Sequence, residues 1–284
     1  MSVKIKTPHE IELMREAGRI LALVHENLAK EIKPGMSTLD IDRLGEEMIR
    51  SYGCIPSFKN YCGYPASICV SINEEVVHGI PNKNRIIQED DIVSLDAGVI
   101  YKGYHSDAAR TLIMPAASEE VRKLVEVTKQ SFFEGMKQAV PGNHVVDIAR
   151  AIQEYVESFG YSVVRDLIGH GVGAKLHEDP EVPNFVGRKR GAKLRPDMTI
   201  AVEPMINLGE YGWSWNTYIE PTDKLRYLLT QLAQTLGCNS WCDHLSYEQE
   251  TEYKETIYDS DEFNLIEEAI TRNTPYKKLV IGSL

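Results

Sequence analysis

Long apolar runs, a signal region and an excess of positive charge are all missing from this sequence of 284 residues. It holds no stretch of about 18 or more uncharged apolar residues, so we expect no membrane-spanning helix. Lys and Arg number 31 against 42 Asp and Glu, and this net charge of −11 argues against a broad nucleic-acid footprint. The five cysteines are an odd number in a chain without a signal segment, which predicts reduced thiols in a cytoplasmic protein.

The local signals that are present predict a pair of helices near the N-terminus. The composition is that of an ordinary globular protein, with 43% hydrophobic residues. Thr7-Pro8-His9-Glu10 is a capping box with proline at the first helical position. Pro34-Gly35 breaks this helix, and a second helix is expected from Ser37 or Thr38 to Gly53.

The same helix pair returns 107 residues later. The recurring residues are helix breakers, caps and core positions: Pro34, Gly35, Asp40, Ile41 and Gly53 correspond to Pro141, Gly142, Asp147, Ile148 and Gly160. Chance agreement is the alternative, but the matches coincide with matching helices and turns. The sequence therefore predicts a structural duplication, with two related αβ halves.

Each helix pair is followed by strand-like sequence that ends in a carboxylate. Residues 92–96 end at Asp96, and a turn leads to a return segment that carries Asp107. Adding the repeat offset of 107 to Asp96 gives Glu203, at the end of residues 199–202. A pseudo-twofold axis would bring such strand ends together, so we expect one shared site there.

The candidate site consists of Asp96, Asp107, Glu203 and His170, which lies among glycines in Ile168–Gly173. Carboxylates with one imidazole suit Mn, Fe, Co or Zn better than metals that prefer thiolates. Taken singly, each Asp could be a turn residue and the His a hydrogen-bonded loop residue. Their repeat-related positions favour a metal site.

Several separate motifs closely resemble the type I methionine aminopeptidases, in the right order from Lys6 to Leu208. They are Ile168-Gly169-His170-Gly171 through His177-Glu178-Asp179-Pro180, Asp96-Ala97-Gly98, Asp107–Thr111, His78-Gly79-Ile80-Pro81 and Glu203-Pro204-Met205. The resemblance implies an α+β fold of the pita-bread (creatinase/aminopeptidase-like) type, with two pseudo-twofold αβ halves around a central antiparallel sheet. It also implies hydrolysis of the N-terminal methionine from nascent proteins and peptides.

By this resemblance, the chain uses up to two divalent ions, Co, Mn, Fe or Zn. Asp96 chelates one ion, Asp107 bridges both, and His170 and Glu203 bind the other. Glu203 also shuttles a proton during catalysis.

The resemblance also assigns residues to the substrate. His78 and His177 match the two family histidines that contact the scissile amide. Tyr61, Tyr64 and Cys69 match the pocket for the methionine side chain, although each could be a plain core residue. Aromatic and sulfur surfaces suit a thioether.

The chain departs from the family after about residue 209. A fifth metal ligand, a bridging Glu, is expected 31 residues after Glu203, where this chain has Gln234. Glu220 and Glu248 are weak substitutes at the wrong spacing. Residues 210–284 hold 13 acidic and 6 basic residues. We therefore expect an aminopeptidase domain over 1–209 that lacks its usual last strands, and an atypical acidic segment over 210–284, from a different module, a frameshift or a fusion.

Other interpretations remain at this point. A catalytically impaired module could bind peptide N-termini or a protein partner, and a proline-directed peptidase would share the fold. Cys238, Cys242 and His244 could hold zinc, but free thiols suit two cysteines better. For the enzyme we expect nascent chain ends as substrate, ribosome association as a compatible partnership, no membrane or nucleic-acid partner, and a monomer.

Overall fold

The computed structural model describes residues 3–165, 167–208 and 280–281, and alternates helices with antiparallel strands. The helices are α1 (Pro8–Glu31), α2 (Thr38–Ser51), η1 (Tyr61–Gly63), α3 (Glu119–Met136) and α4 (Val145–Glu157). The strands are β1 (Ile55–Pro56), β2 (Ile68–Ile72), β3 (Ile92–Tyr101), β4 (Tyr104–Ile113), β5 (Ser162–Val163), β6 (Gly169–Gly171), β7 (Glu178–Val182), β8 (Ile206–Asn207) and β9 (Val280–Ile281). Residues 60–65 belong to a second compact unit and are treated by themselves.

The predicted capping signals start both helices of the first half. At α1, the Thr7 hydroxyl accepts from the Glu10 backbone N–H, and the Glu10 carboxylate accepts from that of Thr7. At α2, Ser37 and Asp40 form the same reciprocal pair. These bonds satisfy backbone donors that the first turn of a helix leaves free. Both predicted helix starts are confirmed.

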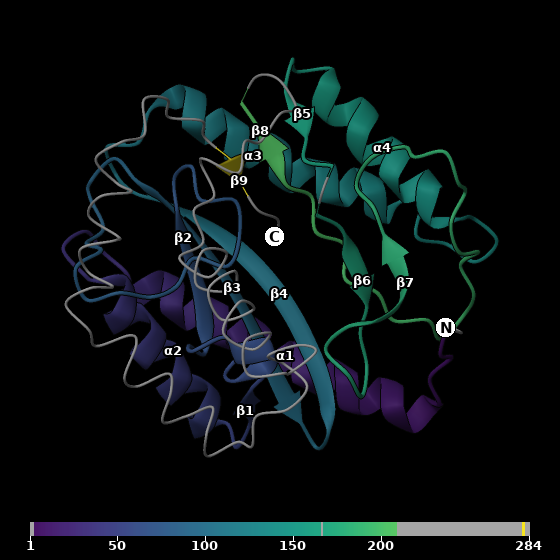
Figure 1. Ribbon diagram of the computed structural model, residues 1–284, viewed down its shortest axis with the longest axis horizontal. Coiled ribbons are helices and arrows are strands. Elements are labelled where there is room, and N and C mark those ends of the chain that lie inside the picture. Colours follow the sequence, from purple (N-terminus) through teal and green to yellow (C-terminus); the bar gives the residue numbers. More distant parts are fainter. Residues whose placement is uncertain (1–2, 166, 209–279, 282–284) are drawn as a thin grey trace, which may run out of the picture. The chain divides into compact units, whose positions relative to one another are not determined.

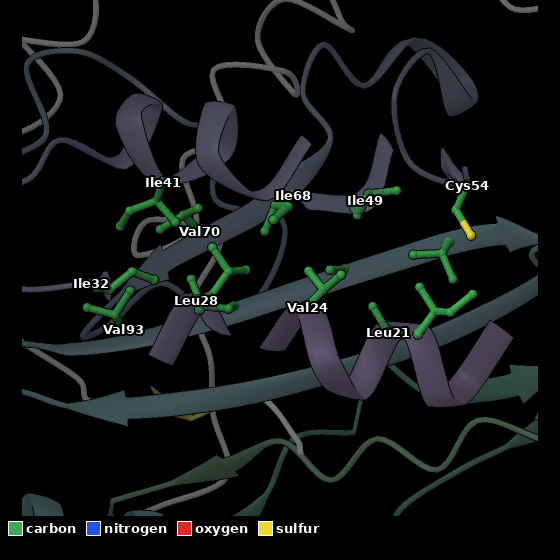
Figure 2. Close-up of a cluster of buried hydrophobic side chains, with 14 of the residues drawn as sticks. Leu21, Val24, Leu28, Ile32, Ile41, Ile49, Cys54, Ile68, Val70 and Val93 are labelled. Carbon is green, nitrogen blue, oxygen red and sulfur yellow. The ribbon is translucent and has the colours of Figure 1, made fainter. Parts of the chain in front are cut away.

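In the first half, α1 and α2 pack on a sheet in which β3 pairs with β1, β2 and β4 (Figure 1). All pairings are antiparallel. Figure 2 shows the core between these layers, where apolar side chains of both helices meet those of β2 and β3. Leu21, Val24 and Leu28 of α1 are 0% exposed. Burying each such side chain contributes about 1.5–3 kcal/mol.

The second half has its own core, in which α3 and α4 pack together and α4 contacts β5 and β7. Leu124, Ile148 and Ile152 are fully buried there. β8 pairs with β5, and β6 pairs with β7. The two cores correspond to the two predicted halves.

The backbone pairings repeat at the offset found in the sequence. Ile55 faces Ile100 in the β1–β3 pair, and their counterparts Ser162 and Asn207 face each other in the β5–β8 pair. The isolated bridge between Ser37 and Ile86 likewise recurs between residues 144 and 193. Equivalent residues therefore occupy equivalent places in the two halves, down to single hydrogen-bonded pairs.

Most of the predicted acidic segment lies outside the described residues. This includes residues 224–236 and 262–271, whose sequences predict helical stretches. The described pair Val280–Ile281 forms β9, which pairs with β8. The expected domain boundary near residue 209 stays a prediction. Among the helices described, none is both long and apolar enough to cross a membrane.

A hydrogen bond of the His25 side chain links α1 to β4, the strand that carries Asp107. Its Nε2 lies 2.9 Å from the carbonyl oxygen of Ala108, and the residue is only 1% exposed. Within the described part of the chain, Nδ1 has no hydrogen-bond partner. Burial lowers the pKa of His25 from 6.5 to about 4, because a charged ring would lose its water without gaining an acceptor at Nδ1.

His25 should therefore make stability fall in acid. The unfolded chain takes up this proton near pH 6.5, whereas the folded chain does so only near pH 4, so stability decreases as the pH falls through that window. His25→Gln keeps a donor for Ala108 but does not titrate. Between pH 7 and pH 5 we expect the natural protein to lose about 2 kcal/mol more unfolding free energy than the variant. Urea unfolding at both pH values measures this, and equal losses would contradict it.

Candidate metal centre

The β3–β4 hairpin places Asp96 and Asp107 on one face of its sheet. Asp107 pairs with Gly98, and Asp96 pairs with Ala109, so the two aspartates are diagonal neighbours on adjacent strands. Successive side chains of a strand point to opposite faces, and the intervening Ala97 belongs to the first core. The helices therefore cover one face of the hairpin, and the aspartates lie on the other.

Burial and mutual repulsion dominate the behaviour of Asp96. Its pKa lies well above the ordinary value, first because the group is buried and then because Asp107 and Glu203 are negatively charged neighbours. The side chain of Asp107 also interacts directly with that of Asp96, which raises the pKa of Asp96 further. Without a cation, the surroundings of Asp96 therefore oppose its ionisation.

The second half supplies His170 from β6 and Glu203 from the segment before β8. The backbone N–H of Ala201 donates to the carbonyl of His170 at 2.7 Å, which joins these two segments. The buried Asn184 donates from its side chain to the backbone carbonyl of Glu203 at 2.6 Å. Both candidate side chains therefore start from backbone that is held by hydrogen bonds.

Asp107, His170 and Glu203 converge on one point. One potential ligand atom of each lies within 4.8 Å of those of the other two. The Nε2 atom of His170 is 3.5 Å from Oδ2 of Asp107 and 3.2 Å from Oε1 of Glu203. Thus the structure brings together residues that are far apart in sequence, with Asp96 beside them.

The imidazole of His170 is oriented for coordination. Its Nδ1 is 2.8 Å from the carbonyl oxygen of Gly171, an acceptor that favours the tautomer with the proton on Nδ1. Nε2 is then free to offer its lone pair to the cluster, as in many metal-ligating histidines. Without an ion, burial lowers the pKa of His170, but the nearby carboxylates of Asp107 and Glu203 outweigh this and raise it to about 10.

These observations fit a divalent cation. The donors are carboxylate oxygens and one imidazole nitrogen, the set preferred by hard or borderline ions. Oε1 of Glu203 is buried and, within the described residues, has no hydrogen bond of good geometry despite its closeness to His170. Burial also raises the pKa of Glu203. A cation would compensate the charges that the protein itself leaves unbalanced.

The two predicted substrate histidines behave differently from His170. The ring of His177 stands edge-on to that of His170, with centroids 4.2 Å apart. Burial and the neighbouring His170 lower the pKa of His177 to about 4, so it is neutral at pH 7. The charge of His78 contributes to the same lowering, and His78 has a left-handed backbone with φ of 58°. His177 therefore lies beside the cluster, and the charge of His78 influences the pKa of His177.

The predicted methionine pocket is only partly placed. Cys69 pairs with Asp96 across β2 and β3, which puts its side chain on the site face, and it is 3% exposed. Tyr61 and Tyr64 lie in the separate unit of residues 60–65, where the backbone N–H of Tyr64 donates to the carbonyl of Tyr61. Their contribution to the pocket stays a prediction.

The structure adds residues that the sequence interpretation did not include. His105 precedes Asp107 by two residues on β4, so it shares the site face, and its Nδ1 lies 3.0 Å from the Ser57 hydroxyl. Strand alternation could have found it. Asn184 and the ion pair between Lys6 and Glu178 carry no comparable local signal, because their partners are distant in sequence.

The comparisons with known proteins agree with this geometry. The model of metallopeptidase family M24 matches residues 12–225. A methionine aminopeptidase of Clostridium acetobutylicum is 56% identical over 207 residues, 73% of this chain and 83% of the relative. A crystal structure of a methionine aminopeptidase from Thermotoga maritima has a TM-score of 0.72 at 43% identity, covering 74% of this chain and 85% of that one.

A prolidase from Pyrococcus furiosus shares the fold alone, with a TM-score of 0.64 at 24% identity, over 73% of this chain and 59% of the prolidase. The fold is that of the pita-bread metallopeptidases, and the chain belongs to metallopeptidase family M24. Within that family the predicted resemblance to methionine aminopeptidases is confirmed.

The close approach of β6 and β7 supports His170, and it can be tested at Gly171. A Cβ atom there would lie 2.2 Å from the carbonyl oxygen of Asp179, so the strands would have to separate. We expect Gly171→Ala to lower the unfolding free energy of the metal-free protein by about 1–3 kcal/mol. Gly187→Ala is the control, because a Cβ there meets nothing within 4 Å. Urea unfolding that gives the same stability for both variants would contradict this account of the strand spacing.

Proposed function

We propose that this chain hydrolyses the peptide bond after the N-terminal methionine of nascent proteins and peptides. The observation that carries the proposal is the convergence of Asp107, His170 and Glu203 in a chain that matches methionine aminopeptidases over most of its length. The alternative of a module that only binds peptide ends has no comparable support among these relatives. Membership of a metallopeptidase family supports the use of divalent metal.

Asp107, His170 and Glu203 would hold one divalent ion, and Asp96 with a share of Asp107 would hold a second. Co, Mn, Fe and Zn all suit this donor set. When bound, such ions supply Lewis-acid activation of the peptide carbonyl and of the attacking water.

The protein groups would perform the proton transfer and the positioning. Glu203 accepts the proton of the attacking water and passes it to the leaving amine, a task suited to its buried carboxylate and raised pKa. Neutral His177 donates a hydrogen bond to the scissile amide, and His78 contacts the same group. Cys69, with Tyr61 and Tyr64, would accommodate the methionine side chain.

The altered C-terminal segment sets the level of activity in this proposal. Residues 1–209 would form the peptidase domain without its usual last strands, and the expected fifth ligand is replaced by Gln234. Three protein ligands are enough for one ion in an open catalytic site. The second ion would bind weakly. We further propose a cytoplasmic monomer that acts on chains emerging from the ribosome.

Release of methionine from a Met-Ala-Ser peptide, with Mn or Co added, tests the function. We expect the natural chain to release methionine, and His170→Ala or a chelator to abolish release. A chimera with the last strands of a normal family member after Leu208 should be faster by at least about 10-fold, because a lost ligand should cost no less than a lost outer-shell partner. A natural chain without activity would overturn the proposed function, and equal rates would overturn the account of the C-terminal segment.

The separation of metal ligands from substrate residues gives a second prediction. His177→Ala should lower kcat by about 100-fold, as for removal of one donor to the reacting carbonyl, with metal affinity retained. His78→Ala should also lower turnover with metal retained, whereas His170→Ala should lose the metal. Calorimetric titration of Mn into each variant, beside methionine-release rates, measures both quantities. Loss of metal binding in His177→Ala or His78→Ala would show that the assignment is wrong.

A further inference from the structure

A buried ion pair includes Glu178, the residue that follows the proposed substrate histidine His177. The Nζ atom of Lys6 is 2.8 Å from Oε2 of Glu178, and each side chain is only 4% exposed. The two residues are 172 positions apart in sequence. Buried charges are costly unless their geometry is good, so a pair kept at this place calls for an explanation beyond general stability.

Glu178 also closes the loop that contains His177. Its Oε1 accepts the backbone N–H of Lys175 at 3.1 Å, while Oε2 accepts from Lys6. The backbone N–H of Gly173 donates to the carbonyl of Lys175, and the carbonyl of Gly173 accepts from His105. Both oxygens of one carboxylate thus fix the turn between β6 and β7.

The pair is packed against this turn without spare room. A Cβ atom at Gly173 would lie 2.6 Å from Cε of Lys6 and 2.8 Å from Oε1 of Glu178. A side chain at position 173 would therefore displace the lysine or the carboxylate. A shift of either charged group would move the loop as well.

Lys6 is itself held in place from both sides. Its backbone N–H donates to the carbonyl of Asp197 at 2.9 Å, and the next residue, Thr7, caps α1. Lys4 makes a useful contrast, because its Nζ is 3.8 Å from the same carboxylate and its side chain is 59% exposed. Only Lys6 provides a rigid buried contact.

His177 is the residue immediately before Glu178, and its ring packs on that of His170. Glu178 begins β7 and pairs with Gly171, the neighbour of His170. We propose that Lys6 is a positioning residue, which acts through Glu178 to hold the imidazole of His177 in the orientation that the scissile amide requires. This inference rests on the proposed role of His177 in the aminopeptidase reaction.

The test combines Lys6→Met with His177→Ala in the full chain. Lys6→Met keeps length and apolar character but removes the charge. We expect kcat for methionine release to fall about 10-fold, within the range for a slightly misplaced group, with KM and Mn affinity unchanged. Lys4→Met should match the natural protein. In the His177→Ala background, Lys6→Met should cause no further loss, because the group it positions is already gone.

A second readout does not depend on turnover. In the metal-free protein, the nuclear magnetic resonance signal of the His177 ring should shift in Lys6→Met by more than in Lys4→Met. If Lys6→Met is poorly folded, Lys6→Met with Glu178→Gln removes both charges and avoids an unpaired carboxylate; it should fold and show the same loss of kcat.

Several results would overturn the inference. An undiminished loss of kcat from Lys6→Met in the His177→Ala background would show a merely structural role, as would an unshifted His177 signal. Wild-type kcat in a folded variant without both charges would do the same. A natural chain that releases no methionine would instead refute the proposed function, so the two failures are distinguishable.

Discussion

Mutual repulsion of carboxylates in a place with little water is the constraint on which this structure depends. Beyond burial, the negative charges of Asp107 and Glu203 raise the pKa of Asp96, and the charge of Asp107 raises the pKa of Glu203. Like charges at such distances cannot all remain ionised without a compensating cation. In the protein alone, His170 lies against these carboxylates, which raise its pKa to about 10. Backbone hydrogen bonds at His170 and Glu203 hold the cluster together despite the repulsion between its carboxylates.

The duplicated fold provides the rigid frame. Each half has its own core. The expectation that both carboxylates end strands is wrong, because β3 continues past Asp96 to Tyr101, and Glu203 follows only an isolated bridge at Ile200. β1–β3 and β5–β8 pair in the same register at the repeat offset, so Asp96 and Glu203 each precede an equivalent pair of hydrogen-bonded residues. The symmetry is incomplete, since His170 has its own hairpin of β6 and β7. The β3–β4 hairpin therefore places Asp96 and Asp107, the segment before β8 places Glu203, and the β6–β7 hairpin adds the imidazole.

Local and periodic signals made much of this predictable. The capping residues Thr7 and Ser37 predicted helix starts, and the 107-residue offset predicted the meeting of Asp96 and Glu203. Contacts between segments that are distant in sequence could not be predicted from such local or periodic patterns. Neither Lys6 nor Glu178 belongs to a periodic pattern that points to the other, because their pairing depends on how the N-terminal segment crosses the second half. Gln234 and its neighbours lie outside the described residues, so the expected loss of the fifth ligand stays a prediction.

Buried charge occurs at two kinds of place in this protein, the Lys6–Glu178 ion pair and the carboxylate cluster, and the surroundings shift the carboxyl pKa values in opposite directions. At Lys6 and Glu178, burial raises the pKa of the carboxyl, but the hydrogen bond from the lysine outweighs it and the pKa is lowered. That pair is balanced within the protein and needs no ligand. At Asp96 and Glu203 the pKa values are raised, and the balance is left to something outside the chain. A cation that binds only the folded site would stabilise the fold in proportion to its concentration over its Kd. The charges of the candidate metal centre thus need a cation to balance them, whereas Lys6 and Glu178 balance each other within the protein.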